Sequence, residues 1–180
     1  MVDSNNVIYP KVSLLMVMSV NGVVAQNIVE NSFDWSSEED REQFLEKTRN
    51  IGTVIMGANT YRSIGSKPYE GVRFYVMTNT PDTFRENEKV SFHQGSIKEL
   101  LFQLAQENVG HVALLGGPQI NAQCFEHNLV DDIYLTIEPL LMPDGMHLAT
   151  SFGERVTLKL ESLETLNEAN TLLLKYRVVK

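Results

Sequence analysis

The sequence has very little cysteine: Cys124 is the only one in 180 residues. A single cysteine excludes a disulfide within the chain and argues against a cysteine-based zinc site. We expect Cys124 to be a small buried apolar side chain. The four histidines, at positions 93, 111, 127 and 147, show no spacing typical of metal ligands. The sequence therefore predicts no metal site.

Long hydrophobic runs and basic charge are also scarce. The longest nearly unbroken apolar stretch, residues 12–20, contains serines and falls well short of the about 20 residues that a spanning helix needs. Residues 1–6 are polar and acidic, unlike a signal peptide, so we expect a cytoplasmic protein without membrane association. The net charge of −8 argues against a nucleic-acid partner. It does not bear on a small anionic ligand, which backbone amides and local cations bind.

The chain otherwise has an ordinary globular composition, with 43% hydrophobic and 21% charged residues, and we expect one domain over residues 1–180. Apolar runs predict strands, and apolar residues at helical spacing predict helices. The expected strands are 12–18, 23–25, 53–56, 72–77, 112–115, 130–141, 155–163 and 172–179. The expected helices begin at Ser36, Gly57, Ser96 and Pro118, and the last three end near 65, 108 and 126.

The order of these elements indicates the fold class. Alternation of strands and helices, followed by a strand-rich end, predicts an α/β fold with a mainly parallel central sheet and an antiparallel hairpin at its C-terminal edge. In the first helix, Ser36 and Glu39 have capping-box spacing, and Phe44, Leu45 and Thr48 supply an inward face.

Glycine occupies two junctions between a buried strand and a helix start. Gly57 follows strand 53–56, and Gly116-Gly117-Pro118 follows strand 112–115. In an open α/β sheet, ligands collect beyond the carboxyl ends of the strands, and amides at glycine approach a phosphate without an obstructing side chain. Each junction alone is equally well explained as a turn. Neither matches the dinucleotide G-x-G-x-x-G spacing or the P-loop.

Among the acids, Asp40 stands in the first turn of the first predicted helix, close in sequence to Trp35 and with Phe44 on the same helical face. A carboxyl group against aromatic rings can have a raised pKa and deliver a proton near neutral pH. The alternative is a first-turn acid that the helix dipole favours. On the strand predicted at 130–141, Tyr134, Thr136 and Glu138 share one face, which either lines a site or contacts water. Asp131 and Asp132 are interpreted as solvent-exposed residues at the start of this strand.

These features occur in the order found in a known superfamily. The segment 55–65, IMGANTYRSIG, resembles the dihydrofolate reductase motif at the second strand and the helix after it, and Leu115-Gly116-Gly117 resembles that family's cis-linked glycine pair. Trp35 and Asp40 have the interval of the tryptophan and catalytic acid of bacterial dihydrofolate reductases. Phe44 resembles the aromatic that covers the pterin, and Thr136 the threonine that bonds the acid. The resemblance implies a dihydrofolate reductase-like three-layer fold.

A second family within that superfamily resembles the sequence more closely. Segments 19–22, 37–40, 129–132 and 137–141 are similar to the reductase domain of riboflavin-biosynthesis deaminase-reductases. That resemblance implies the same fold, a homodimer, and NADPH-dependent reduction of the ribose of a phosphoribosylamino-pyrimidine. No zinc-deaminase motif is present, so the chain is at most a stand-alone reductase.

The two resemblances together imply a small-molecule reductase that transfers a hydride from nicotinamide to a C=N or C=O group. Asp40 would supply the proton, positioned by Trp35 and Thr136, and Val17, Phe44 and Leu115 would contact substrate. NADPH is the expected cofactor, with NADH left open. The implied cofactor-binding residues are Val24, Ala25, Gly57, Asn59, Thr60, Thr78, Asn79, Gly116, Gly117, Pro118, Gln119 and Ile120.

The sequence departs from both families where they bind substrate. Val72 replaces the arginine that holds the folate tail, and Arg73, one place later, should face the other side of its strand. Residues 63–66, SIGS, replace the Asp-Asp-Pro loop of the riboflavin enzymes, and Ala58 replaces the arginine that many dihydrofolate reductases aim at the 2′-phosphate. A true dihydrofolate reductase and a non-catalytic nucleotide-binding module therefore remain alternatives.

Overall fold

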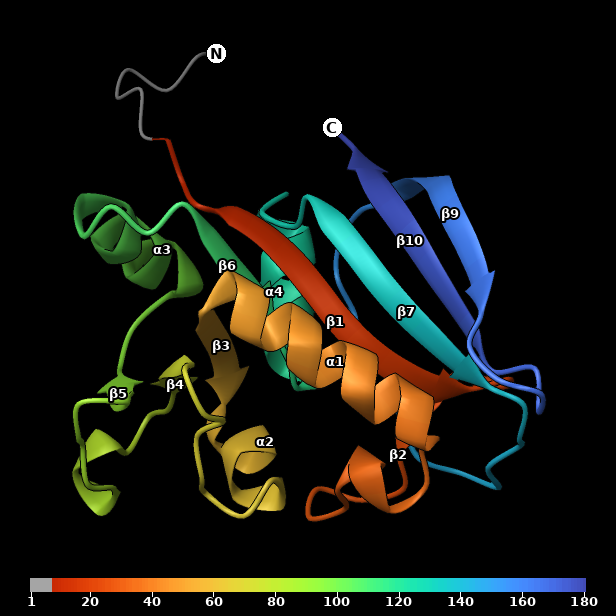
Figure 1. The fold of residues 1–180 in the computed structure, drawn as a ribbon. Coiled ribbons are helices and arrows are strands. Elements are labelled where there is room, and N and C mark those ends of the chain that lie inside the picture. Colours follow the sequence, from red (N-terminus) through yellow and green to blue (C-terminus); the bar gives the residue numbers. More distant parts are fainter. Residues whose placement is uncertain (1–7) are drawn as a thin grey trace.

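The computed structural model describes residues 8–180, and the expectation that residues 1–6 are unlike a signal peptide lies outside them. Its centre is an eight-stranded sheet with the order β5-β4-β3-β6-β1-β7-β10-β9 (Figure 1). Its strands are β1 (Lys11–Ser19), β3 (Thr53–Gly57), β4 (Arg73–Met77), β5 (Val90–His93), β6 (His111–Leu114), β7 (Asp132–Glu138), β9 (Thr157–Thr165) and β10 (Leu172–Val179). A separate pair joins β2 (Val23–Ala25) to β8 (Met146–His147).

The first six strands in the sheet order, β5, β4, β3, β6, β1 and β7, pair in parallel with their neighbours. Strand β10 pairs antiparallel with both β7 and β9. This arrangement confirms the predicted fold class, a mainly parallel sheet with an antiparallel hairpin at its C-terminal edge. Parallel strands need crossover connections, and the chain supplies them as helices. These are α1 (Glu38–Ile51), α2 (Ala58–Ser63), α3 (Ile97–Gln106) and α4 (Pro118–Glu126), with short 3₁₀ turns at Ser32–Asp34 and Pro81–Thr83.

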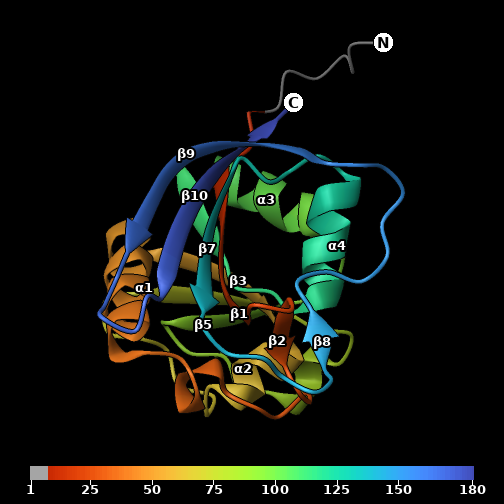
Figure 2. The same cartoon turned by 90° about the vertical axis from the view of Figure 1, so that its right-hand side faces the viewer.

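Helices cover both faces of the sheet and make three layers, with α1 on one side and α3 and α4 on the other (Figure 2). Because successive strand residues point to opposite faces, the apolar runs supply two cores. Val12, Leu14 and Ile55 pack with α3, whereas Leu15 and Val54 belong to the core on the α1 and α2 side. Within residues 8–180, every helix is too short or too polar to cross a bilayer.

The first helix begins one residue later than predicted. Ser37, not Ser36, is its N-cap, and the Ser37 hydroxyl accepts a hydrogen bond from the backbone N–H of Asp40. Ser36 is buried and does not cap the helix, and its hydroxyl lies beside the Asp40 carboxyl group. The capping box predicted for Ser36 and Glu39 is therefore wrong, because a buried carboxylate, Glu138, binds Ser37 and draws that residue into the cap.

Some other boundaries also differ. The strand predicted at 130–141 is restricted to β7. The short strands β5 and β8 were not predicted, because neither segment, VSFH or MH, is a continuous apolar run. Asp132 is not solvated: it is buried and forms an ion pair with Lys11, whose strand lies beside β7. Cys124 is fully buried as expected, and burial raises its pKa to about 12.

Candidate active site

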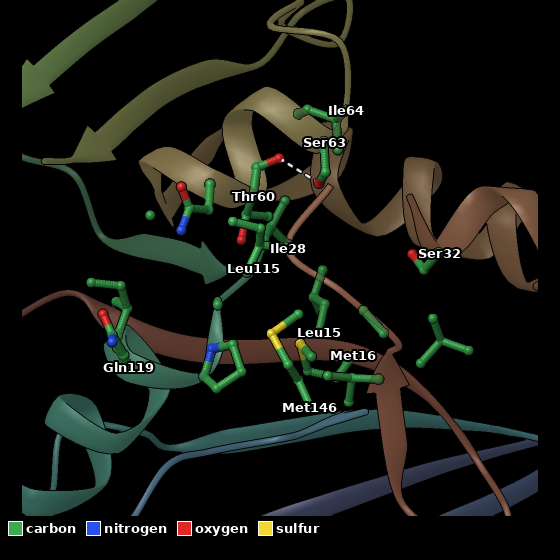
Figure 3. A pocket seen from close by; sticks show the side chains of 18 of the residues that line it. Leu15, Met16, Ile28, Ser32, Thr60, Ser63, Ile64, Leu115, Gln119 and Met146 are labelled. Carbon is green, nitrogen blue, oxygen red and sulfur yellow. Dashed lines mark hydrogen bonds between the residues drawn. The ribbon is translucent and has the colours of Figure 1, made fainter. Parts of the chain in front are cut away.

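A cavity of about 700 Å³ lies beyond the carboxyl ends of the central strands. Its walls come from β1, α1, the starts of α2 and α4, β7 and the β2–β8 pair. Figure 3 shows side chains from four of these elements around it, including Met16, Thr60, Gln119 and Met146. A cavity at this position and of this size is typical of a small-molecule or cofactor site.

The two glycine junctions of the sequence meet at this cavity. The backbone N–H of Gly57 donates a hydrogen bond of 2.7 Å to the carbonyl oxygen of Gly116. The Gly116–Gly117 peptide is cis, as the resemblance implied. A Cβ atom at Gly117 would lie 3.3 Å from Thr60 Oγ1, and one at Gly57 would lie 3.4 Å from Ile120 Cγ1. Glycine therefore keeps open a narrow space between the starts of α2 and α4.

The residues around this space suit a dinucleotide. The first turn of a helix leaves amide N–H groups without intrahelical partners, and α4 begins directly after Gly117 with Pro118 in its first turn. The side chains of Asn59 and Thr60 line the cavity, and Ser63 Oγ donates to the Thr60 carbonyl oxygen (Figure 3). Polar groups at a glycine-lined helix start are the usual partners of phosphate. The structure thus fits the phosphates of the implied cofactor.

Asp40 lies in the opposite wall of the cavity with only 4% of its surface exposed. Burial raises the pKa of this carboxyl group, hydrogen bonding with Thr136 lowers it in part, and the charge of Glu138 adds to the increase. Asp40 stands in the first turn of α1, as the alternative interpretation also has it, but it is buried and faces the cavity. Its pKa therefore lies above the ordinary value of an aspartate.

Gln43 was not predicted as a site residue. It lies one helical turn after Asp40 on α1, and its Nε2 donates to Thr136 Oγ1 at 3.2 Å and to Asp40 Oδ1 at 3.4 Å. The spacing of three residues puts Gln43 on the cavity side of the helix with Asp40, a signal that the sequence offered. This amide joins α1 to β7 and holds Asp40 beside Thr136.

Trp35 makes no direct hydrogen bond to Asp40 within the described residues. It is absent from the cavity lining, and its indole Nε1 is buried without a hydrogen-bond partner in the described chain. Gln43 makes the side-chain contact to Asp40 instead. Gly116 does not line the cavity either, but its carbonyl oxygen binds Gly57 at the cavity edge.

Aromatic rings cover the next part of the cavity. The ring of Phe44 meets Phe33 edge-on at 5.5 Å and Tyr69 edge-on at 5.9 Å between centroids. Burial raises the pKa of Tyr69 to about 12, so its phenol stays neutral and can donate a hydrogen bond. Val17 and Leu115 complete the apolar surface as predicted. Such a surface suits a planar ring.

Lys47 is a second cavity residue that was not predicted from the sequence. It is half-buried in the cavity wall, and its Nζ lies 5.2 Å from the centre of the Tyr134 ring. Lys175 lies over the same ring at 5.8 Å but is paired with Glu161 at 2.9 Å. Lys47 takes part in no ion pair within residues 8–180. It shares a helical face with Asp40 and Phe44, seven and three residues before it, which the sequence pattern could have revealed.

The far end of the cavity is formed at the carboxyl ends of β3 and β4. Ala58, Thr78 and Asn79 line it, as the resemblance implied for the 2′-phosphate region of the cofactor. Arg73 is exposed with its guanidinium over the Tyr75 ring and is absent from the lining, so it does not replace the folate-binding arginine. The other predicted site residues that line the cavity are Val24, Ala25, Pro118, Gln119, Ile120 and Thr136. The described residues contain no cluster of potential metal ligands.

Comparison with known proteins gives one family and several structural relatives. The model of the RibD C-terminal domain matches residues 10–172. The uncharacterized protein YwjB of Bacillus subtilis is 24% identical over 166 residues, which span 88% of this chain and 94% of that protein.

Three solved structures share the fold. A pyrimidine reductase-like protein of Corynebacterium diphtheriae superposes with a TM-score of 0.80 at 16% identity and covers 95% of this chain and 92% of its own. The RibD protein of Acinetobacter baumannii gives 0.76 at 15% identity, with 96% of this chain and 59% of its own covered. Dihydrofolate reductase of Enterococcus faecalis, solved with NADP(H), gives 0.70 at 19% identity, with 96% and 100% covered.

Proposed function

The chain belongs to the RibD C-terminal domain family, and from that premise we propose that it is an NADPH-dependent reductase of a C=N or C=O bond in a small nitrogen heterocycle. One observation carries the proposal: the buried, protonatable Asp40 faces the same cavity as the glycine-lined starts of α2 and α4. A site for an anionic cofactor and a proton donor thereby share one enclosed space. A reduction of this kind needs both.

The residues of the chain have separable roles in this proposal. Gly57, Gly117 and Thr60 would hold phosphate, and Val24 and Ala25 would contact the nicotinamide. When bound, the reduced nicotinamide supplies a hydride to the carbon of the double bond. Asp40 gives its proton to the nitrogen or oxygen of that bond, either directly or through water, and Thr136 and Gln43 hold the carboxyl group in place. The products are the saturated bond, oxidised nicotinamide and the Asp40 carboxylate, which regains its proton from solvent.

The cavity also favours a particular kind of substrate. Phe44 and Tyr69 provide a surface for a ring, and Lys47 provides a cation with no carboxylate partner in the described chain. A heterocycle with a phosphate or carboxylate substituent fits both features. Within this class, the phosphoribosylamino-pyrimidine that the family resemblance implies is the first compound to test. The cofactor preference proposed is NADPH, supported by Thr78 and Asn79 at the far end of the cavity.

A panel of substrates tests the proposal. NADPH oxidation is followed with 5-amino-6-(5-phosphoribosylamino)uracil, dihydrofolate and small neutral carbonyl compounds, for the wild type and for Asp40→Asn. We expect turnover of the phosphorylated pyrimidine, reduced by about 10²–10⁴-fold in Asp40→Asn while NADPH binding is retained. Unchanged turnover of Asp40→Asn across the pH range would overturn the role of Asp40.

Two rival functions give different results in the same panel. A true dihydrofolate reductase would oxidise NADPH with dihydrofolate at ordinary enzyme rates, although Val72 is buried where the folate-binding arginine would stand. A nucleotide-binding module would bind NADPH and oxidise it with none of the compounds. The presence of a buried acid held by two side chains favours an enzyme over such a module. We also propose a homodimer acting in the cytoplasm, which gel filtration with light scattering and cell fractionation test.

A further inference from the structure

Glu138 is a buried acid that the proposed reaction does not use. It is the last residue of β7 and exposes only 4% of its surface. Its Oε1 accepts hydrogen bonds from the backbone N–H and the hydroxyl of Ser37, both at 2.7 Å, and its Oε2 accepts one from Thr171 Oγ1 at 2.7 Å. Three donors are thus directed at the two oxygens of this side chain.

No cation balances this charge within residues 8–180, since none of the four ion pairs there includes Glu138. The compensation comes from α1, because Ser37 is the N-cap of that helix and the N-terminus of a helix carries a partial positive charge. Glu138 therefore acts as a second cap, contributed by the sheet. A buried carboxylate without such partners would be strongly destabilising.

The same contacts reach Asp40. The Ser37 hydroxyl, which donates to Glu138, accepts the backbone N–H of Asp40 at 3.3 Å, so a chain of two hydrogen bonds joins the two acids. Thr136, two residues before Glu138 on the same face of β7, approaches the Asp40 side chain from the other end. Asp40 is thus fixed through its backbone by Ser37 and Glu138, and through its side chain by Thr136 and Gln43.

The charge of Glu138 also acts on Asp40. A second negative charge close to a buried carboxylate is unfavourable, and this repulsion raises the pKa of Asp40 beyond the larger effect of burial. The other charged groups of α1 around Asp40 are the exposed Glu38 and Glu39, Arg41, which bonds the Phe33 carbonyl oxygen, and Lys47 two turns along the helix.

We propose that Glu138 is a positioning residue of the candidate active site, which holds Asp40 in the cavity wall through Ser37 and whose charge keeps Asp40 able to deliver a proton. The proposal rests on the proposed function for its catalytic meaning. The structural and electrostatic coupling of Asp40 and Glu138 does not depend on any enzymatic activity and can be measured without it.

The test is a titration of Asp40 in the cofactor-free protein by carboxyl ¹³C NMR, with Asp40→Asn used to assign the signal. Glu138→Gln removes the charge but keeps the contacts, since its oxygen accepts from Ser37 and its amide nitrogen donates to the Thr171 hydroxyl. We expect the Asp40 midpoint to fall by about half a pH unit or more in Glu138→Gln. If the chain is a reductase, its rate at a pH above that midpoint falls by about threefold, which is the same change expressed as protonated fraction.

Ser37→Ala is the matched control, because it breaks the hydrogen-bond chain and leaves the charge of Glu138 in place. It should lower the melting temperature through loss of the helix cap while the Asp40 midpoint moves much less than in Glu138→Gln. Glu138→Ala, in which water can occupy the vacated space, repeats the charge removal if Glu138→Gln does not fold. An unchanged midpoint in both charge-removing variants, or an equal shift in Ser37→Ala, would overturn the proposal. Because the midpoint is measured without substrate, absence of reductase activity would count against the proposed function alone.

Discussion

The amide nitrogen of Gly57 lies 2.7 Å from the carbonyl oxygen of Gly116, although 59 positions of sequence, the difference of their numbers, separate the two residues. Gly57 is the last residue of β3 and Gly116 follows the end of β6 by two residues, and these two strands are neighbours in the sheet. The two turns thereby form the two sides of one cradle at the cavity. Asp40 faces the same cavity from α1 and adds a carboxyl group to it.

Gly117→Ala should weaken NADPH binding by about tenfold or more, because its new Cβ would lie 3.3 Å from Thr60 Oγ1 and take up the space left for phosphate. Isothermal titration calorimetry measures this change. Gly110→Ala is the control, since a Cβ atom there has no neighbour within 4 Å. Equal affinities in the two variants would show that the cradle does not bind the cofactor.

Lys47→Met should raise the KM for a phosphorylated or carboxylated substrate by about tenfold and leave kcat nearly unchanged, because the lysine binds the anionic group equally in the ground and transition states. Neutral substrates should be unaffected. Lys175→Met is the matched control: this lysine flanks the same Tyr134 ring but is paired with Glu161 and does not line the cavity. A similar rise in KM in both variants would contradict a specific role for Lys47.

Ala58→Arg should strengthen the preference for NADPH over NADH. Ala58 lines the cavity at the start of α2, and an arginine at this point can form a bidentate contact with a 2′-phosphate. We expect the ratio of kcat/KM for NADPH to that for NADH to rise by about tenfold. Ala58→Gln, of comparable length but uncharged, separates charge from bulk. The assignment of this end of the cavity fails if the two variants change the ratio alike.

Asp40→Asn should stabilise the protein at neutral pH. Burial raises the pKa of Asp40 in the folded chain above the value of about 3.8 for an exposed aspartate, so the native state holds this proton more tightly than the unfolded state. Its contribution to stability is therefore complete below the unfolded pKa and is lost as the pH rises through the folded pKa. Asparagine has no charge to bury, and the advantage of Asp40→Asn should disappear in acid.

Urea unfolding between about pH 3.5 and 8 measures this difference. Glu39, its neighbour on α1, is the contrasting control, because a hydrogen bond from Asn167 lowers its pKa. Glu39→Gln should therefore lose stability at neutral pH and lose less in acid. A wild-type protein that is more stable than Asp40→Asn at neutral pH would contradict the burial of a protonatable acid.

Much of this fold could be predicted from the sequence because its signals are local. Apolar runs such as Val12–Met18 identify strands buried on both faces, and the helix predicted to begin at Ser96 forms with Ser96 as its N-cap. The glycine junctions and Asp40 were also visible, since glycine at a helix start and an acid in a first turn are properties of short segments. The sequence did not predict β8 or the N-cap of α1. Strand β8 forms by pairing with β2, and the N-cap Ser37 is bound by Glu138, so both depend on residues distant in sequence.

The sequence by itself determined the layers, the parallel sheet and the kinds of residue at its functional edge, because hydrophobic periodicity and backbone freedom act within a few residues. Only the tertiary structure decided that Gln43 bonds the Asp40 carboxyl group, that Lys47 lines the cavity, and that Glu138 bonds the N-cap of α1. Those outcomes depend on burial and on distances between elements far apart in the chain. The pKa of a carboxyl group depends on its burial and on the charges and donors around it, and these surroundings are not visible in a short segment of sequence.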